Sequence, residues 1–275
     1  MIVSTINAQE ISASRCLGEN YQIHFPENIS ELIEINEDAF ILGNGTNTLF
    51  ISNQKNQFVS LKKLAKYELK KNILYAEAGI LLPNLIKNLK AQNIGGLEFT
   101  YPIPATLGGA IYQNFGAFDK TISDLIIEVN CFDLKNKKHL TLSKQECAFG
   151  YRHSVFKTNK YLITACLLQL ENKDSGTIQN NCSTFKQKRE LSHPLAYTLG
   201  SIFKNPKGFS AGKLIDDCEL KGYSYKSVQI CNTHANVILC NKNSKAEDFV
   251  ELIKIIQTKV STNFQIKLEP EIKIY

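Results

Sequence analysis

The sequence predicts a mixed α+β fold built from two or three compact subdomains. Segments with the alternation of strands and segments with helical periodicity follow one another without an internal repeat. The chain has 275 residues, which exceeds the usual size of a single hydrophobic core. Its 43% hydrophobic and 21% charged residues are an ordinary globular composition, so the chain can bury sizeable cores.

The first two thirds of the chain begin with an apolar strand, a tight Gly/Asn turn and a second strand, expected over residues 39–51. A half-buried strand over 72–79 precedes a short helix over 81–93, and Pro83 stands near the helix start, where proline is tolerated. Residues 94–118 are predicted to be irregular, because they hold five glycines and two prolines. The later elements are strands over 124–134 and 161–171 and a helix over 176–190.

The last third continues the α+β mixture, with a short helix over 211–220 and strands over 227–231 and 237–241. The clearest local signal follows, because Ser244 and Glu247 have the spacing of a capping box. The helix that they would start has one apolar stripe, formed by Phe249, Leu252, Ile253, Ile256 and Val260. We therefore expect this helix to be structural.

Residues 266–275 alternate between apolar and charged side chains, which is typical of a half-exposed strand. The apolar face would consist of Ile266, Leu268, Ile272 and Ile274. The charged face would consist of Lys267, Glu269, Glu271 and Lys273. Pro270 favours a sheet edge or a bulge.

Composition argues against several classes of protein. No run approaches the roughly 18 apolar residues of a membrane helix, and the first ten residues lack the pattern of a secretory signal, so a cytoplasmic protein without membrane insertion is expected. The net charge of +6 is spread over many lysines without a dense basic patch, which favours small anionic ligands over nucleic acid. The eight cysteines include no C-x-x-C pair, so we expect buried reduced thiols and no metal site.

Two glycine-rich stretches are candidate phosphate cradles. GNGTN at 43–47 follows an apolar strand, and consecutive turn amides can form a cationic nest, although a plain hairpin turn is the alternative. Gly108 and Gly109 precede a potential short helix whose free N–H groups could bind a pyrophosphate, and Asn114 and Gly116 continue this lining. Together they suggest one extended ligand held between two subdomains, with glycine packing as the alternative.

From residue 39 to the C-terminus the chain carries an ordered set of motifs: GNGTNTLF, PATLGGAIYQNFGAF, FGYRHSVFK, GSIFKNP, AGKLIDDCELKG, THANVI and LEPEIKI. This set resembles the UDP-N-acetylenolpyruvoylglucosamine reductase (MurB) family. The resemblance implies a vanillyl-alcohol-oxidase-type FAD-binding fold of two subdomains plus a C-terminal α+β substrate-binding subdomain. It places the first subdomain at 1–55, to which the strand 268–275 could return, the second at 56–185 and the UDP-sugar domain at 186–267.

The resemblance also implies the activity, in which NADPH reduces non-covalently bound FAD and UDP-N-acetylglucosamine enolpyruvate then takes the hydride. Ser201 matches the family's proton donor, and Arg152 and Glu271 match the residues that stabilise the enolate. Glu269 is a rival for the role of Glu271. No insertion with the gating tyrosine is evident, so the chain resembles the shorter subgroup, and a monomer is expected.

The same resemblance implies two sets of binding residues. The FAD set is Gly43, Asn44, Gly45, Thr46, Asn47, Thr106, Gly108, Gly109, Asn114 and Gly116. The substrate set is Lys204, Asn205 and Arg189. Ala105 stands where the family typically has glycine. This departure keeps two alternatives open: a degenerate member that binds FAD or a UDP-sugar without turnover, and a related flavin oxidase with another substrate.

Overall fold

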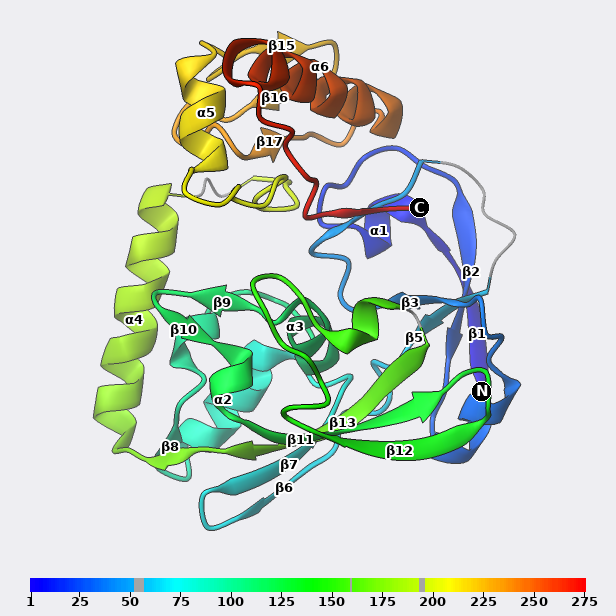
Figure 1. Ribbon diagram of the computed structural model, residues 1–275. Coiled ribbons are helices and arrows are strands. Elements are labelled where there is room, and N and C mark those ends of the chain that lie inside the picture. Colours follow the sequence, from blue (N-terminus) through cyan, green and yellow to red (C-terminus); the bar gives the residue numbers. More distant parts are fainter. Residues whose placement is uncertain (52–56, 159, 193–195) are drawn as a thin grey trace. The chain divides into compact units, whose positions relative to one another are not determined.

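The computed structural model describes residues 1–51, 57–158, 160–192 and 196–275, and it confirms the mixed α+β class (Figure 1). The chain divides into two compact units. Unit 1 comprises Met1–Ser4, Gln22–Asn44 and Lys55–Gln187. Unit 2 comprises Thr5–Tyr21, Gly45–Gln54 and Lys188–Tyr275. Each unit is therefore assembled from three separate segments, and the division into three subdomains stays a prediction.

Unit 1 is organised around a five-stranded antiparallel sheet with the order β12-β11-β13-β7-β6. Its strands are β6 (Tyr67–Lys70), β7 (Ile73–Glu77), β11 (Ile126–Asp133), β12 (Lys138–Ser143) and β13 (Tyr161–Gln169). The central strand β13 is buried from Leu162 to Cys166, as its apolar run predicts. The strands predicted over 72–79, 124–134 and 161–171 are thus confirmed.

A second sheet has the order β1-β2-β5-β3, and β5 pairs in parallel with both β2 and β3. Its strands are β1 (Ile2–Asn7), β2 (Asn20–Phe25), β3 (Phe40–Leu42) and β5 (Phe58–Ser60). The chain passes from one unit to the other within β1 and again within β2.

Three longer helices belong wholly or mainly to unit 1: α2 (Leu82–Lys90), α3 (Leu107–Gln113) and α4 (Ser175–Ser192). Helix α2 has Pro83 in its first turn and buries one face, as predicted. The short elements of the N-terminal two thirds are α1 (Ala8–Ile11), η1 (Ile29–Glu34), β8 (Ile94–Gly95), η2 (Glu98–Thr100), β9 (Gly116–Ala117), β10 (Lys120–Thr121), η3 (Ile122–Asp124), η4 (Val155–Thr158) and β14 (Glu171–Asn172).

Unit 2 packs two helices with a small antiparallel sheet of order β15-β16-β17. Its elements are α5 (Ala211–Asp217), β15 (Ser224–Tyr225), β16 (Val228–Ile230), β17 (Ile238–Leu239) and α6 (Ala246–Phe264). The predicted apolar stripe of α6 is buried from Phe249 to Val260 and forms much of the unit's core. Strand β4 (Thr48–Leu49) pairs in parallel with β18 (Lys273–Ile274) in the same unit.

The predicted capping box of α6 is wrong. The helix begins at Ala246 with Lys245 as its N-cap, and the N-cap side chain makes no capping hydrogen bond. The Ser244 hydroxyl is buried and serves the preceding loop, since it donates to the Ser227 carbonyl at 2.6 Å and accepts from the Asn241 amide at 2.9 Å. A tertiary contact thus takes the group that the local spacing assigned to the cap.

The predicted alternation of residues 266–275 holds only in part. Leu268 and Ile272 are buried, but Ile274 is 37% exposed, and regular strand is limited to Lys273–Ile274. Lys273, predicted to face solvent, is partly buried, and desolvation lowers its pKa to about 8. The local pattern therefore fails within four residues of Pro270.

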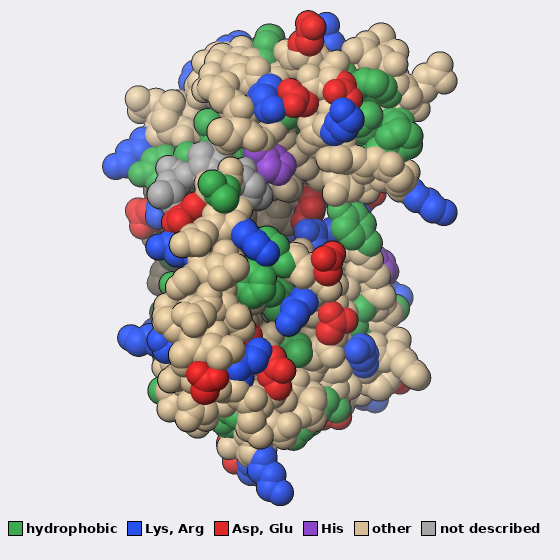
Figure 2. All heavy atoms as spheres, turned by 90° about the vertical axis from the view of Figure 1, so that its left-hand side faces the viewer, with side chains coloured by type: hydrophobic (Ala, Val, Ile, Leu, Met, Phe, Trp, Pro, Cys, Tyr) green, Lys and Arg blue, Asp and Glu red, His purple; other side chains and the backbone are tan. Residues whose placement is uncertain are grey.

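The surface and the thiols complete the description. Among the described residues, no helix is both long and apolar enough to cross a membrane. All eight cysteines are free thiols, and six of them are buried. Basic and acidic side chains are interspersed on the face drawn in Figure 2.

Candidate active site

The turn after β3 requires glycine at its centre. Gly45 has a φ of +70°, and a Cβ there would stand 1.6 Å from the Ile11 carbonyl oxygen. Its own carbonyl accepts a hydrogen bond from the Ala13 amide at 3.0 Å. The turn, which continues through Thr46, is therefore packed tightly on residues 11–13 of unit 2.

The start of the first predicted phosphate cradle, Gly43 and Asn44, meets the second cradle within unit 1. A Cβ on Gly43 would lie 3.0 Å from Thr106 Oγ1 and 3.8 Å from Gly109 Cα. The Asn44 side chain donates to the Pro104 carbonyl at 2.6 Å. Two stretches some 60 residues apart in the sequence thus form one glycine-lined surface around Thr106.

The prediction that the helix after the glycine pair offers free N–H groups is wrong. Gly108 and Gly109 lie inside α3, whose N-cap is Thr106. The Gly108 amide donates to the Ala78 carbonyl at 2.8 Å, and the Gly109 amide donates to Thr106 Oγ1 at 3.2 Å. The Leu107 amide likewise bonds the Ile80 carbonyl, so residues 78–80 and the cap use the helix's first amides.

The glycine-lined surface nevertheless fits a phosphate-bearing cofactor such as FAD. Gly43 and Gly109 are partly exposed and bring backbone without side chains up to the Thr106 hydroxyl, which a side chain at either position would crowd. Ala105 is not one of the described residues with positive φ, and its carbonyl accepts from the Leu82 amide at 3.0 Å. Alanine at this position is therefore accommodated without the left-handed backbone that would favour glycine.

Arg152 occupies a strained tight turn in unit 1. Gly150 and His153 exchange two backbone hydrogen bonds of 3.1 and 3.2 Å across the turn, and Arg152 adopts a φ of +50°. The guanidinium carbon lies 5.4 Å from the ring centre of Tyr151 and 5.9 Å from that of Phe115. Non-glycine residues hold such a conformation where surrounding contacts impose it, often at functional sites.

Two predicted FAD residues lie beside this turn. The Asn114 carboxamide donates to the Gly150 carbonyl at 2.9 Å and accepts from the Ser123 amide at 3.3 Å. A Cβ on Gly116 would stand 3.5 Å from Arg152 Nη1. The structure therefore brings Arg152, Asn114 and Gly116 together, and the observed role of the Asn114 side chain is to support the arginine turn.

Ser201 and Glu271 lie on neighbouring segments of unit 2. The Glu271 amide donates to the Ile202 carbonyl at 2.7 Å, one residue after Ser201. The Glu271 carbonyl accepts from the Asn47 side chain at 3.1 Å, so Asn47, a predicted FAD residue, ties the C-terminal segment to the glycine turn. On its other side, Ser201 forms an antiparallel bridge with Val237.

The predicted substrate residues have local partners of their own. Lys204 forms an ion pair of 2.5 Å with Glu269, whose side chain is 69% exposed. Asn205 Oδ1 accepts from the Ala211 amide at the start of α5 at 2.9 Å. Arg189 lies in the last turn of α4. The two glutamates therefore differ in their contacts. The Glu269 side chain pairs with Lys204, whereas the Glu271 backbone is hydrogen-bonded beside the Ser201 segment.

Sequence reasoning missed Asn236 in the THANVI motif. Its side chain is buried and bonds the backbone of Phe203 at 2.8 and 3.0 Å. A polar amide placed within an apolar strand-like run was the available signal, because such a group needs buried partners. The motif was noted, but no role was predicted for this residue.

Comparison with known proteins finds two matching domain families. Residues 25–143 match the FAD binding domain family, and residues 192–275 match the UDP-N-acetylenolpyruvoylglucosamine reductase C-terminal domain. A glycine-lined surface in the part that matches an FAD domain, joined to this C-terminal domain, defines a FAD-binding oxidoreductase.

Full-length relatives specify the family. The UDP-N-acetylenolpyruvoylglucosamine reductase of Fusobacterium nucleatum is 35% identical over 271 residues, covering 96% of this chain and 95% of its own length. That of Caldanaerobacter subterraneus is 36% identical over 238 residues, covering 86% and 78%. The crystal structure of the reductase from Thermus caldophilus matches with a TM-score of 0.86 at 26% identity, over 100% of this chain and 99% of that one. The chain belongs to the UDP-N-acetylenolpyruvoylglucosamine reductase (MurB) family, flavoproteins of peptidoglycan synthesis.

Proposed function

We propose that this protein reduces UDP-N-acetylglucosamine enolpyruvate to UDP-N-acetylmuramate at the expense of NADPH, with Ser201 as the proton donor. The observation that carries the proposal is the hydrogen bond from the Glu271 amide to the Ile202 carbonyl, because it sets two of the three proposed catalytic residues on adjacent segments. FAD held by the glycine-rich residues would supply the hydride chemistry that links NADPH to the enolpyruvyl double bond.

The glycine surface around Thr106 would hold the cofactor through close approach of its phosphates to the backbone. Gly43 and Gly109 would present backbone without side chains to the phosphates, and the buried Thr106 hydroxyl holds the two segments together by accepting from the Gly109 amide. Gly45, Thr46 and Asn47 are the remaining proposed FAD residues of the glycine turn. These contacts bind and orient, and they leave the proton chemistry to other residues.

The product requires a proton on the carbon that carries the substrate carboxylate. When hydride adds to the distal carbon, negative charge develops on the neighbouring carbon and its carboxylate. Arg152 would stabilise that charge, because a guanidinium binds a carboxylate through two parallel hydrogen bonds. Ser201 would then donate its hydroxyl proton, which a strongly basic carbanion-like centre can accept when the geometry is right. Glu271 would polarise the reacting carboxylate of the substrate.

The remaining details of the proposal concern specificity. Lys204, Asn205 and Arg189 would bind the UDP-sugar, with the Lys204–Glu269 pair opening when the anionic substrate arrives. Surface ion pairs of this kind contribute only about 0 to 1 kcal/mol, so the cost of opening the Lys204–Glu269 pair is small.

The protein would act as a monomer of the shorter subgroup, which lacks the insertion with the gating tyrosine.

The test is to measure the two half-reactions of Ser201→Ala separately by stopped-flow absorbance of the flavin. We expect reduction by NADPH to stay within about threefold of wild type, while reoxidation by the enolpyruvyl sugar slows about a hundredfold or more. Ser261→Ala, on the exposed side of α6, serves as the control and should change neither rate. Equal slowing of both half-reactions would remove Ser201 from the proton transfer. A purified protein that takes up no FAD would overturn the proposed function as a whole.

A further inference from the structure

One buried carboxamide supports the backbone just after Ser201. Asn236 Nδ2 donates to the Phe203 carbonyl at 2.8 Å, and Asn236 Oδ1 accepts from the Phe203 amide at 3.0 Å. The Asn236 backbone carbonyl also accepts from the Ile202 amide at 2.9 Å. Three hydrogen bonds from one residue therefore hold the backbone of two successive residues, Ile202 and Phe203, directly after Ser201.

The other edge of this segment is bonded as well. The Ile202 carbonyl accepts from the Glu271 amide at 2.7 Å, and the Lys204 amide donates to the Glu269 carbonyl at 2.9 Å. Residues 202–204 thus lie between the Asn236 loop and the C-terminal segment that carries Glu271. A shift at Asn236 would be passed through one peptide to Ser201 and through another to Glu271.

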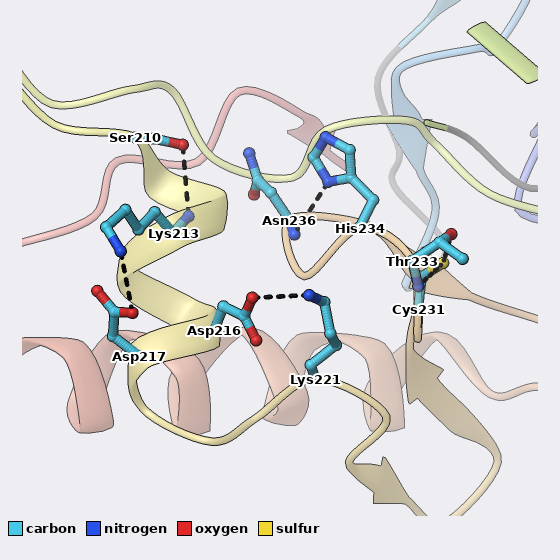
Figure 3. Close-up of polar contacts among 9 residues, drawn as sticks. All are labelled: Ser210, Lys213, Asp216, Asp217, Lys221, Cys231, Thr233, His234 and Asn236. Carbon is cyan, nitrogen blue, oxygen red and sulfur yellow. Dashed lines mark hydrogen bonds and ion pairs between the residues drawn. The ribbon is translucent and has the colours of Figure 1, made fainter. Parts of the chain in front are cut away.

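The loop that presents Asn236 is itself anchored. The Asn236 amide donates to His234 Nδ1 at 3.2 Å, and Figure 3 shows this amide facing the imidazole. The Val237 amide donates to the His234 carbonyl at 3.0 Å, and the Cys231 amide donates to the Val237 carbonyl at 2.8 Å. Burial lowers the pKa of His234, which favours the neutral ring with Nδ1 as acceptor. Asn236 is therefore a fixed support.

We propose that Asn236 is a positioning residue for proton transfer, because its carboxamide fixes the Phe203 peptide groups and so sets Ser201 against Glu271. The inference rests on the proposed role of Ser201. A serine hydroxyl is a weak acid, so its proton transfer depends strongly on alignment, and a misplacement of about 1 Å costs on the order of a hundredfold in rate. Hydride transfer from NADPH does not use this alignment.

The proposal predicts that the reoxidation rate of Asn236→Asp recovers at lower pH, which simple destabilisation of the fold does not produce. In Asn236→Asp, a protonated carboxyl group can still donate to the Phe203 carbonyl and accept from the Phe203 amide. Once ionised, it would set a carboxylate against that carbonyl. Burial raises the pKa of a carboxyl group, so the change between the two forms falls in an accessible pH range.

The experiment measures reoxidation of the reduced holoenzyme by the enolpyruvyl sugar, and reduction by NADPH, at about pH 6 and pH 8.5. We expect Asn236→Asp reoxidation to be slowed about tenfold or more at the higher pH and to return to within about threefold of wild type at the lower pH. Asn236→Leu should be slow at both. NADPH reduction and the spectral titration of substrate binding to oxidised enzyme should stay near wild type in both variants.

Wild type must be profiled in parallel, because other groups near the segment can titrate. His234 lies in the same loop, and the charge of Lys221 helps to lower its pKa. Glu271 and Glu269 lie across the segment, and Lys204 belongs to the segment itself. The matched structural control is Ser244→Ala, which removes two hydrogen bonds, to Ser227 and Asn241, from an equally buried side chain of unit 2. It should lower stability without changing the ratio of the half-reactions.

The outcomes separate the two levels of inference. If Ser201→Ala slows reoxidation selectively but Asn236→Asp shows no loss at high pH, the positioning role is refuted and the proposed function stands. The positioning role is also refuted if Asn236→Asp slows both half-reactions equally, or if lower pH does not restore its rate. This test does not require that the Asn236→Leu protein folds. If Ser201→Ala itself is not selective, the proposed role of Ser201 fails first.

Discussion

Gly45→Ala should be severely destabilising, because the added methyl group brings both an unfavourable backbone conformation and a steric clash. The residue has a φ of +70°, and a non-glycine residue in that region costs about 1 to 2 kcal/mol. The new Cβ would also stand 1.6 Å from the Ile11 carbonyl oxygen and 2.7 Å from its carbon. Both are backbone atoms, so no side-chain rotation can relieve the clash.

The size of the clash sets the second cost. Even a tight contact of 3.0 Å requires the Ile11 carbonyl to move by about 1.4 Å, and the Ala13 amide bonds the Gly45 carbonyl in the same contact region. Losing that hydrogen bond costs about 1 kcal/mol, and the displaced packing of residues 11–13 adds to it. We expect a total loss of about 3 to 5 kcal/mol in the free energy of unfolding.

Gly208→Ala is the matched control. Gly208 has a φ of +81°, but a Cβ there would meet no atom within 4 Å, so only the backbone cost of about 1 to 2 kcal/mol applies. Urea unfolding followed by far-UV circular dichroism is the assay, because the chain has no tryptophan. If the two variants lose the same free energy, the close approach of Gly45 to Ile11 does not exist in solution.

Two further predictions concern the C-terminal segment. Burial lowers the pKa of Lys273 to about 8, so the folded protein releases this proton at lower pH than the unfolded chain, and stability should rise with pH above about 8. Relative to Lys273→Met, wild type should gain about 1 kcal/mol between pH 8 and pH 9 in urea titrations, and parallel pH profiles would contradict the burial. Glu271→Gln should slow flavin reoxidation by substrate about tenfold or more, whereas Glu269→Gln, which only opens an exposed ion pair, should stay within about threefold. The reverse order would make Glu269 the catalytic glutamate.

Local patterns predicted the elements whose own residues decide their structure. The α6 stripe and the buried strand β13 were predicted correctly, because each buries a continuous set of its own side chains. Prediction failed where a partner distant in sequence decides the outcome. Ser244 caps no helix because Ser227 takes its hydroxyl, and the α3 amides are not free because residues 78–80 accept two of them.

The candidate site shows the same division. Motif resemblance predicted which residues to consider, and the structure sets Ser201 beside the Glu271 segment. Motif resemblance did not predict that Asn236 and Asn47 support the backbone of the site, because their side chains bond residues 33 and 224 positions away in the sequence. Such contacts depend on chain topology, and a single sequence carries no local periodicity that reports them.

The parallel pairing of β4 with β18 has a consequence for synthesis of the chain. Thr48 finds its strand partner only when Lys273 has left the ribosome, and Leu17 likewise bridges to Lys245. Unit 1, by contrast, has all its residues once residue 187 has emerged. Residues 5–21 and 45–51 must therefore wait through most of translation with apolar surface exposed, including Leu49, which is fully buried in the finished protein. Nascent chains halted before residue 268 should engage chaperones through these early segments.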